Sequence, residues 1–159
     1  MAKTLVNKTV LLILISLFII SGAGLGRAAT LTGSTLRLAI EAAKGKNPTL
    51  EERRALATVT DTLTPAIFRK LGIDPATAPR EDVQELKEVS RLSLRTLDVM
   101  TENDPAALSR VALDDLLSIS RAVMTKIKEM KITDANLKDE RFLQETFFPA
   151  VIDELAKPR

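Results

Sequence analysis

The apolar positions of residues 80–131 follow the repeat of an α-helix and predict two long helices joined by a tight turn. A helix advances about 100° per residue, and this angle gathers the charged residues of the first helix, Arg80 to Thr101, on one side. The other side carries an apolar arc made of Val83, Leu86, Val89, Leu97 and Met100, flanked by Leu92 and Leu94. This arc covers roughly half of the circumference, which is wider than the stripe of a lone surface helix.

The segment between the two helices holds residues that end one helix and begin another. Asp104 can accept a hydrogen bond from the free N–H groups of a new first turn. Pro105 suits the first helical position, because its missing N–H would be unpaired there. The second helix is expected to run from Pro105 to about Lys131. Because so short a turn forces neighbouring helices to be antiparallel, the pattern predicts a central antiparallel hairpin over residues 80–131 that holds most of the core.

Further helices are expected before this hairpin. An apolar stripe runs along residues 34–44. Thr49 and Glu52 then have the spacing of a capping box, in which each side chain bonds to the backbone N–H of the other residue at the start of a helix. The pair Thr64-Pro65 is expected to restart that helix as a short separate piece, Pro65 to Leu71, and the alternative is a kink in a single helix.

A last helix is expected after residue 132. Pro149 should bend it, and its apolar residues recur every four positions, at Leu143, Phe147, Val151 and Leu155. No stretch shows the alternation of apolar and polar residues that is typical of a strand. The fold class is therefore expected to be all-α, with a compact bundle of four to five helices and a single helical domain over residues 30–159.

Residues 1–29 have the layout of a secretory signal peptide. A positively charged start precedes a largely apolar run over residues 10–20, which only Ser16 interrupts, and Gly26-Arg27-Ala28 then satisfies the small-x-small rule for cleavage. The alternative is an uncleaved membrane anchor over residues 9–26, although these eighteen residues lie at the lower edge of a span. A cleaved chain is expected in the periplasm or outside a bacterial cell. An uncleaved chain would be anchored in the inner membrane and would face the periplasm.

The basic character of the chain belongs to its N-terminal segment. The whole chain has 23 Lys and Arg against 21 Asp and Glu, and residues 1–28 hold three of the basic residues and none of the acidic ones. Removing this segment leaves 20 basic and 21 acidic residues, a net charge of −1. A nucleic-acid partner is therefore not expected, because it would require a basic face. The lack of cysteine rules out disulfides and fits a bacterial periplasm better than a eukaryotic secretory route.

The composition also excludes the commonest catalytic and metal sites. The chain has no histidine and no cysteine, so it lacks the usual nucleophile–base pairs and the ligands of an ordinary zinc site. Asp134, Asn136 and Glu145 match three positions of a calcium-binding loop. Lys138, however, stands at a ligand position, and Asp139 stands where a glycine makes the sharp turn. We therefore expect no enzymatic activity, no metal and no cofactor.

The phenylalanines near the C-terminus carry the clearest functional signal. Phe147 falls on the apolar stripe of the last helix, whereas Phe142 falls roughly a third of a turn away from it. One interpretation is an exposed apolar patch that binds a partner protein, formed by Phe142, Phe148 and Ile152. The other is that all the phenylalanines of this segment close the bundle, because Phe is usually buried.

Three functions are compatible with these features. Since the sequence contains none of the usual sets of catalytic residues, we expect an exported, non-enzymatic accessory or adaptor protein that acts through protein–protein contact. An alternative is a helical bundle that binds an apolar small molecule or a lipid between its wide-faced helices. A third possibility keeps residues 9–26 as an anchor and makes the protein a single-span subunit of an envelope complex.

Overall fold

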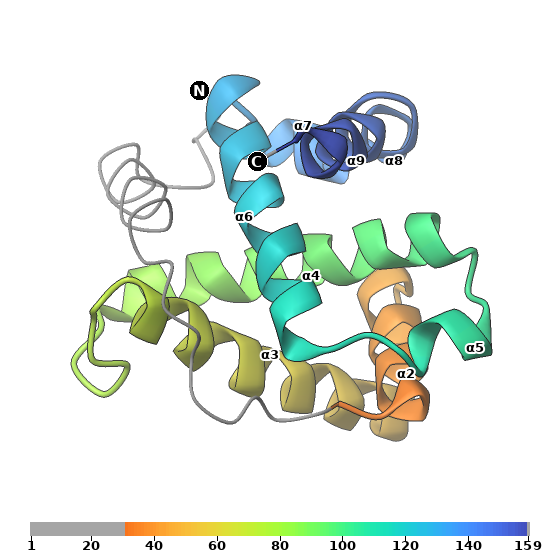
Figure 1. Ribbon diagram of the computed structural model, residues 1–159, viewed down its shortest axis with the longest axis horizontal. Coiled ribbons are helices and arrows are strands. Elements are labelled where there is room, and N and C mark those ends of the chain that lie inside the picture. Colours follow the sequence, from red (N-terminus) through yellow and green to blue (C-terminus); the bar gives the residue numbers. More distant parts are fainter. Residues whose placement is uncertain (1–30, 159) are drawn as a thin grey trace.

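The computed structural model describes residues 31–158, and every regular element in this range is helical (Figure 1). The longer helices are α2 (Gly33–Lys44), α3 (Leu50–Lys70), α4 (Arg80–Thr101) and α6 (Leu113–Glu129). The shorter elements are α5 (Pro105–Leu108), α7 (Asp134–Lys138), α8 (Glu140–Phe142), the π-helical turn η1 (Leu143–Phe147) and α9 (Phe148–Ala156). The prediction of an all-α fold is confirmed for this part of the chain. The signal segment predicted for residues 1–29 lies outside the described residues.

The helix predicted after Thr49 begins with the predicted cap. The Thr49 N–H donates to the Glu52 carboxylate at 2.9 Å, and the Glu52 N–H donates to Thr49 Oγ1 at 3.2 Å. The helix α3 then continues through Pro65 to Lys70. The expected restart of a separate piece at Pro65 is therefore wrong, and the alternative of a single helix is the one observed.

The predicted second helix of the central hairpin is interrupted. The short helix α5 ends at Leu108, and α6 begins only at Leu113, so the prediction of one helix from Pro105 to about Lys131 is wrong. A close approach of α5 to the start of α2 accompanies the break. A Cβ atom at Gly33 would lie only 3.0 Å from the backbone of Ser109, so this contact favours glycine. The Ala112 N–H donates to Asp115 Oδ2 at 2.8 Å and restarts the helix.

In Figure 1, α6 runs across α4, and the two helices are in contact. Small residues allow a close approach at this contact, where Ser93 Oγ and Ser120 Oγ lie 3.0 Å apart. Each of these hydroxyls also lies within hydrogen-bond distance of the carbonyl four residues earlier in its own helix. The apolar arc predicted for α4 is buried at Leu86, Val89, Leu92, Leu94 and Leu97. Met100, predicted on the same arc, is instead 46% exposed.

The C-terminal elements complete the core. The buried apolar residues of all four longer helices join Leu143, Phe147, Phe148 and Val151 in one continuous cluster. Pro149 disturbs the helix through a π-helical turn, in which the Phe148 N–H donates to the carbonyl of Leu143, five residues earlier. A regular α-helix would force the proline ring against the carbonyl four residues before it. Among the described residues, no helix is both long and apolar enough to cross a membrane.

The buried face of α6 leads to a stability prediction. Leu116 is buried against the core and Arg110 is exposed. Leu116→Ala should lower the free energy of unfolding by ~2–5 kcal/mol, because it leaves a cavity in a packed interior. Arg110→Ala should change it by less than ~1 kcal/mol. Denaturant melts measure both values, and equal losses would contradict this packing.

Candidate functional site

The three residues predicted to bind a partner differ in their exposure. Phe148 is fully buried, and the Arg95 guanidinium covers its ring at 5.2 Å from the ring centroid. The prediction of an exposed Phe148 is therefore wrong, because this ring fills the core beside Phe147. Phe142 is partly exposed and packs against the core, and Ile152 is partly exposed. Partner binding through these two residues stays a prediction.

An ion pair ties the start of the C-terminal segment to α4. The Arg95 guanidinium binds the Glu140 carboxylate, which also accepts a hydrogen bond from Gln144 at 3.1 Å. Burial raises the pKa of Glu140, but the hydrogen bonds from Gln144 and Arg95 outweigh this effect and hold the pKa below its usual value. The pair therefore favours the charged carboxylate and anchors α8 on α4.

A second ion pair ties the end of this segment to α6. The Lys126 ammonium lies 3.0 Å from the Glu154 carboxylate of α9 and 2.6 Å from Glu129. The hydrogen bond to Glu129 raises the pKa of Lys126, burial lowers it, and the bond to Glu154 helps to keep it above the usual value. Because both ends of the C-terminal segment are anchored, α9 is part of the bundle and is not a free arm.

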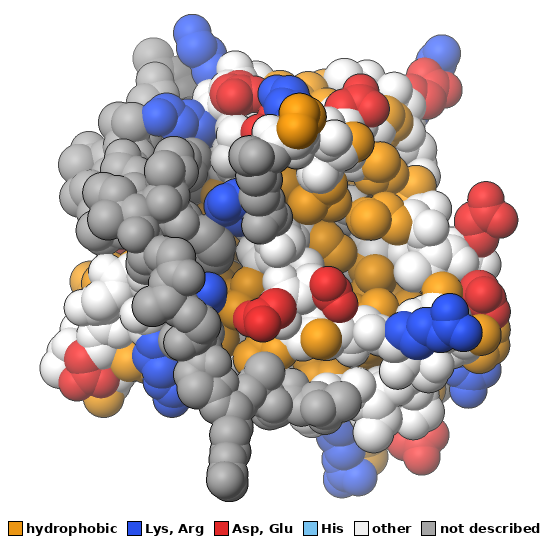
Figure 2. All heavy atoms as spheres, viewed as in Figure 1, with side chains coloured by type: hydrophobic (Ala, Val, Ile, Leu, Met, Phe, Trp, Pro, Cys, Tyr) orange, Lys and Arg blue, Asp and Glu red, His pale blue; other side chains and the backbone are white. Residues whose placement is uncertain are grey.

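Large apolar side chains are exposed at only a few described positions. They are Leu50 at the start of α3 and the consecutive residues Val99 and Met100 near the end of α4. On the face drawn in Figure 2, apolar side chains are visible through the middle of the face and most charged side chains lie around them. Exposure of a few large apolar side chains is normal for a folded protein. It does not indicate a dedicated partner surface.

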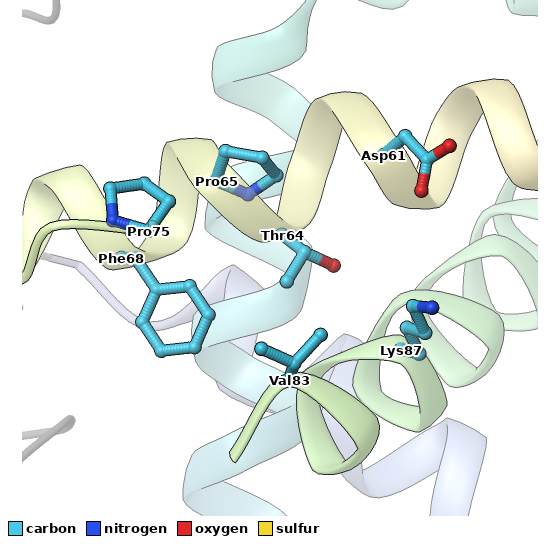
Figure 3. Close-up of a pocket in the computed structure, with 7 residues that line it drawn as sticks. All are labelled: Asp61, Thr64, Pro65, Phe68, Pro75, Val83 and Lys87. Carbon is cyan, nitrogen blue, oxygen red and sulfur yellow. The ribbon is translucent and has the colours of Figure 1, made fainter. Parts of the chain in front are cut away.

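A hollow of about 340 Å³ lies between α3, α4 and the loop that joins them (Figure 3). Its lining residues are Asp61, Thr64, Pro65, Phe68, Pro75, Val83 and Lys87. A second hollow of about 300 Å³ shares Lys87 with the first and is lined by residues of α3 and α4 alone. The two hollows therefore follow the same helix pair.

The local sequence explains how these residues come together. Positions 61, 64, 65 and 68 of α3 share one helical face, and Val83 and Lys87 are one turn apart on α4. The loop leaves α3 through Gly72, which adopts a φ of +70°, a conformation that favours glycine. The Ile73 N–H caps the carbonyl of Phe68 at 3.0 Å. The Ala76 N–H then donates to Asp74 Oδ1 at 3.0 Å, in a turn that includes Pro75.

The hollow has an apolar end and a polar end. Figure 3 shows Phe68, Pro75, Pro65 and Val83 toward one side, with the oxygen and nitrogen atoms of Asp61, Thr64 and Lys87 toward the other. The side chains of Asp61 and Lys87 form no hydrogen bond or ion pair with another described residue. Both charged groups are therefore available to a bound molecule.

Thr64 is the unusual residue of this site. It is only 5% exposed, and its Oγ1 has no hydrogen-bond partner among the described residues. In Figure 3 its methyl group points toward Val83 and its hydroxyl toward the side where Lys87 lies. The other threonines of this part of α3 satisfy their hydroxyls on the carbonyl four residues earlier, as Thr58, Thr60 and Thr62 do.

An unpartnered buried hydroxyl is costly. Leaving such a group without a hydrogen bond costs about 1–3 kcal/mol, so most buried polar groups in proteins have a partner. The following residue removes a further hydrogen bond, because Pro65 has no N–H to donate to the carbonyl of Asp61 within α3. A bound molecule with a polar group would supply the hydrogen bond that the hydroxyl lacks.

The sequence does not reveal this site, because Thr64-Pro65 has the pattern of a helix end or of a kink. The alternating threonines at 58, 60, 62 and 64 are visible in the sequence, but they do not reveal which hydroxyl lacks a partner. That distinction depends on the contact between Thr64 and α4.

The described residues contain no group of three or more His, Cys, Asp or Glu that could hold a metal ion. The partial calcium motif lies on α7, α8 and η1, and Asn136 Oδ1 accepts the N–H of Thr133 at 2.9 Å within a helix cap. Comparison with protein families, with curated proteins and with solved structures finds no match for the chain. The geometry of the hollow is therefore the basis for assigning a function.

The unpartnered hydroxyl can be tested in the free protein. Thr64→Val should raise the free energy of unfolding by ~1 kcal/mol, because it replaces an unsatisfied hydroxyl by a methyl group of similar shape. The matched control is Thr60→Val on the same helix, which removes contacts to the carbonyls of Leu56 and Ala57 at 2.9 and 3.1 Å. This control should be neutral or destabilising. Denaturant melts that show the same change for both variants would contradict the assignment.

Proposed function

We propose that this protein is a non-enzymatic binding protein whose α3–α4 hollow holds a small amphipathic molecule. The observation that carries the proposal is the hydroxyl of Thr64, a residue that lines the hollow, because this hydroxyl is buried without a partner. Ligand pockets combine apolar walls with a few polar groups that fix orientation, and the walls here combine Phe68 and Val83 with Asp61 and Lys87. The absence of histidine and cysteine supports binding rather than catalysis.

We also propose that the protein acts outside the cytoplasm. The support is the layout of residues 1–29, where a positive start and an apolar run precede a small-x-small site. The binding protein would then work in the bacterial periplasm or in the medium. If residues 9–26 remain as an anchor, the same hollow would serve an envelope complex from the inner membrane.

Substitution of Val83 tests the hollow directly. Val83→Asp should place a carboxylate at the apolar end and exclude an apolar ligand, because an unpaired charge is poorly tolerated there. The full chain is isolated from its host, and mass spectrometry identifies the small molecules released on denaturation. We expect an amphipathic molecule in the wild type and a loss of at least about tenfold in the variant.

The control for this experiment makes the same change elsewhere on α4. Val99 is exposed and does not line the hollow, so Val99→Asp should leave the released molecule unchanged. Circular dichroism verifies that both variants are folded. If the wild type releases no more of any small molecule than Val83→Asp does, the proposed function is wrong.

Protein–protein contact is the second candidate function. Phe142 and Ile152 favour it, because both remain partly exposed on the C-terminal elements. Aromatic residues contribute strongly to interfaces when a partner buries them. The anchored position of this segment would present them on a rigid surface.

This candidate predicts different results for two phenylalanines. Phe147→Ala should lower the free energy of unfolding by ~3–5 kcal/mol, because the ring is fully buried. Phe142→Ala should cost less, since part of this ring already lies in water, but it should weaken the capture of a partner from periplasmic extract. Thermal melts and pull-downs measure the two effects. Undiminished capture by Phe142→Ala would remove the candidate.

A further inference from the structure

We propose that the ligand of the α3–α4 hollow is a small zwitterion, specifically an α-amino acid with an apolar side chain. This inference rests on the proposed function and specifies its ligand. It follows from the charges at the polar end, the orientation of the Thr64 hydroxyl and the size of the hollow.

The charges at the polar end favour a molecule with both signs. One carboxylate, that of Asp61, and one ammonium, that of Lys87, lie toward the same side of the hollow, and their charges cancel. A simple anion would be attracted by Lys87 and repelled by Asp61, and a simple amine would experience the reverse. An amino acid satisfies both, because its ammonium group can approach Asp61 while its carboxylate approaches Lys87.

Neither charged residue is committed to another contact. The side chains of Asp61 and Lys87 form no ion pair with each other and no hydrogen bond with another described residue. Many other charged residues of the bundle are paired, including Lys44 with Asp98 and Arg95 with Glu140. The two free charges therefore stand beside the one threonine hydroxyl that is buried without a partner.

The Thr64 hydroxyl adds a directional contact between the two charges. In Figure 3 its oxygen points toward the polar end, and it is buried in the free protein. Neighbouring side chains must therefore move for it to donate to a ligand carboxylate that also accepts from Lys87. Hydrogen bonds to charged acceptors are stronger than neutral ones. Thr64 would thus gain in the complex the partner that it lacks in the free protein.

The size and the apolar end set the rest of the ligand. Small-molecule pockets span roughly 300–1,000 Å³, and this hollow, at about 340 Å³, is at the small end. Phe68, Pro65, Pro75 and Val83 can cover one apolar side chain.

The test uses four probes that share one apolar body and differ in their polar groups. They are L-phenylalanine, 3-phenylpropanoate, 2-phenylethylamine and 2-phenylethanol, each titrated into the full chain and followed by amide chemical shifts. L-Phenylalanine should bind at least about fivefold more tightly than each of the other three, because it alone satisfies both charges.

Substitutions assign this preference to single residues. Asp61→Asn should remove the advantage of L-phenylalanine over 3-phenylpropanoate, and Lys87→Gln should remove its advantage over 2-phenylethylamine. Thr64→Val should weaken L-phenylalanine about three- to tenfold, although it stabilises the free protein. Glu88→Gln is the control, because it removes a carboxylate from the neighbouring hollow and should leave the preference intact.

The outcomes separate this inference from the proposed function. Equal binding of all four probes would overturn the zwitterion and leave the hollow as an apolar site. Tightest binding of 3-phenylpropanoate or of 2-phenylethylamine would overturn it in favour of an anion or an amine. Binding of none of the four would also overturn the zwitterion, and the extraction from wild type and Val83→Asp would then decide the proposed function by itself. A preference for L-phenylalanine that survives both charge substitutions would place the site elsewhere and overturn the assignment to this hollow.

Discussion

The wide apolar face of α4 is the constraint on which the rest of this bundle depends. One helix cannot cover an arc of this width, so α4 packs against α2, α3, α6 and α9 (Figure 1). The small residues Ser93 and Ser120 let α6 cross it closely, and Arg95 at the edge of the arc covers Phe148 and holds Glu140. The C-terminal segment therefore completes the cover of α4, which explains why its largest rings are core residues.

Coverage of α4 by α3 is incomplete, and this produces the hollow. The helix α3 remains continuous through Pro65 because Leu63, Ile67 and Phe68, on both sides of the proline, are buried in the same core. Their burial outweighs the local loss of a backbone hydrogen bond. The facing turns of α3 and α4 and the loop that joins them leave about 340 Å³ between them. Pro65 and the residue with the unpartnered hydroxyl, Thr64, therefore both lie in the wall of this hollow.

The sequence predicts those features that depend on neighbouring residues along the chain. The capping box at Thr49 and the buried arc of α4 are of this kind, and both are observed. The break before Leu113 was not predicted, because it accompanies the contact of Ser109 with Gly33, a residue far away in sequence. Phe148 was misplaced for the same reason, since helical angles do not reveal that Arg95 covers its ring. The sequence does not distinguish Thr64 from Thr60, because it does not show which side chains of α4 lie beside each threonine.

The orientation of Thr64 links the packing of the free protein to its proposed ligand. A helical threonine can satisfy its hydroxyl on the preceding turn, as Thr60 does. In Thr64 the methyl group instead packs toward Val83, and this rotation directs the hydroxyl away from the helix backbone (Figure 3). Valine would fill the same space without an unsatisfied group, so the hydroxyl is unfavourable for folding alone. A ligand that accepts a hydrogen bond from this hydroxyl would add stability to the folded chain by mass action. The hydrogen bond that the free protein lacks would then favour ligands with a polar group at this position.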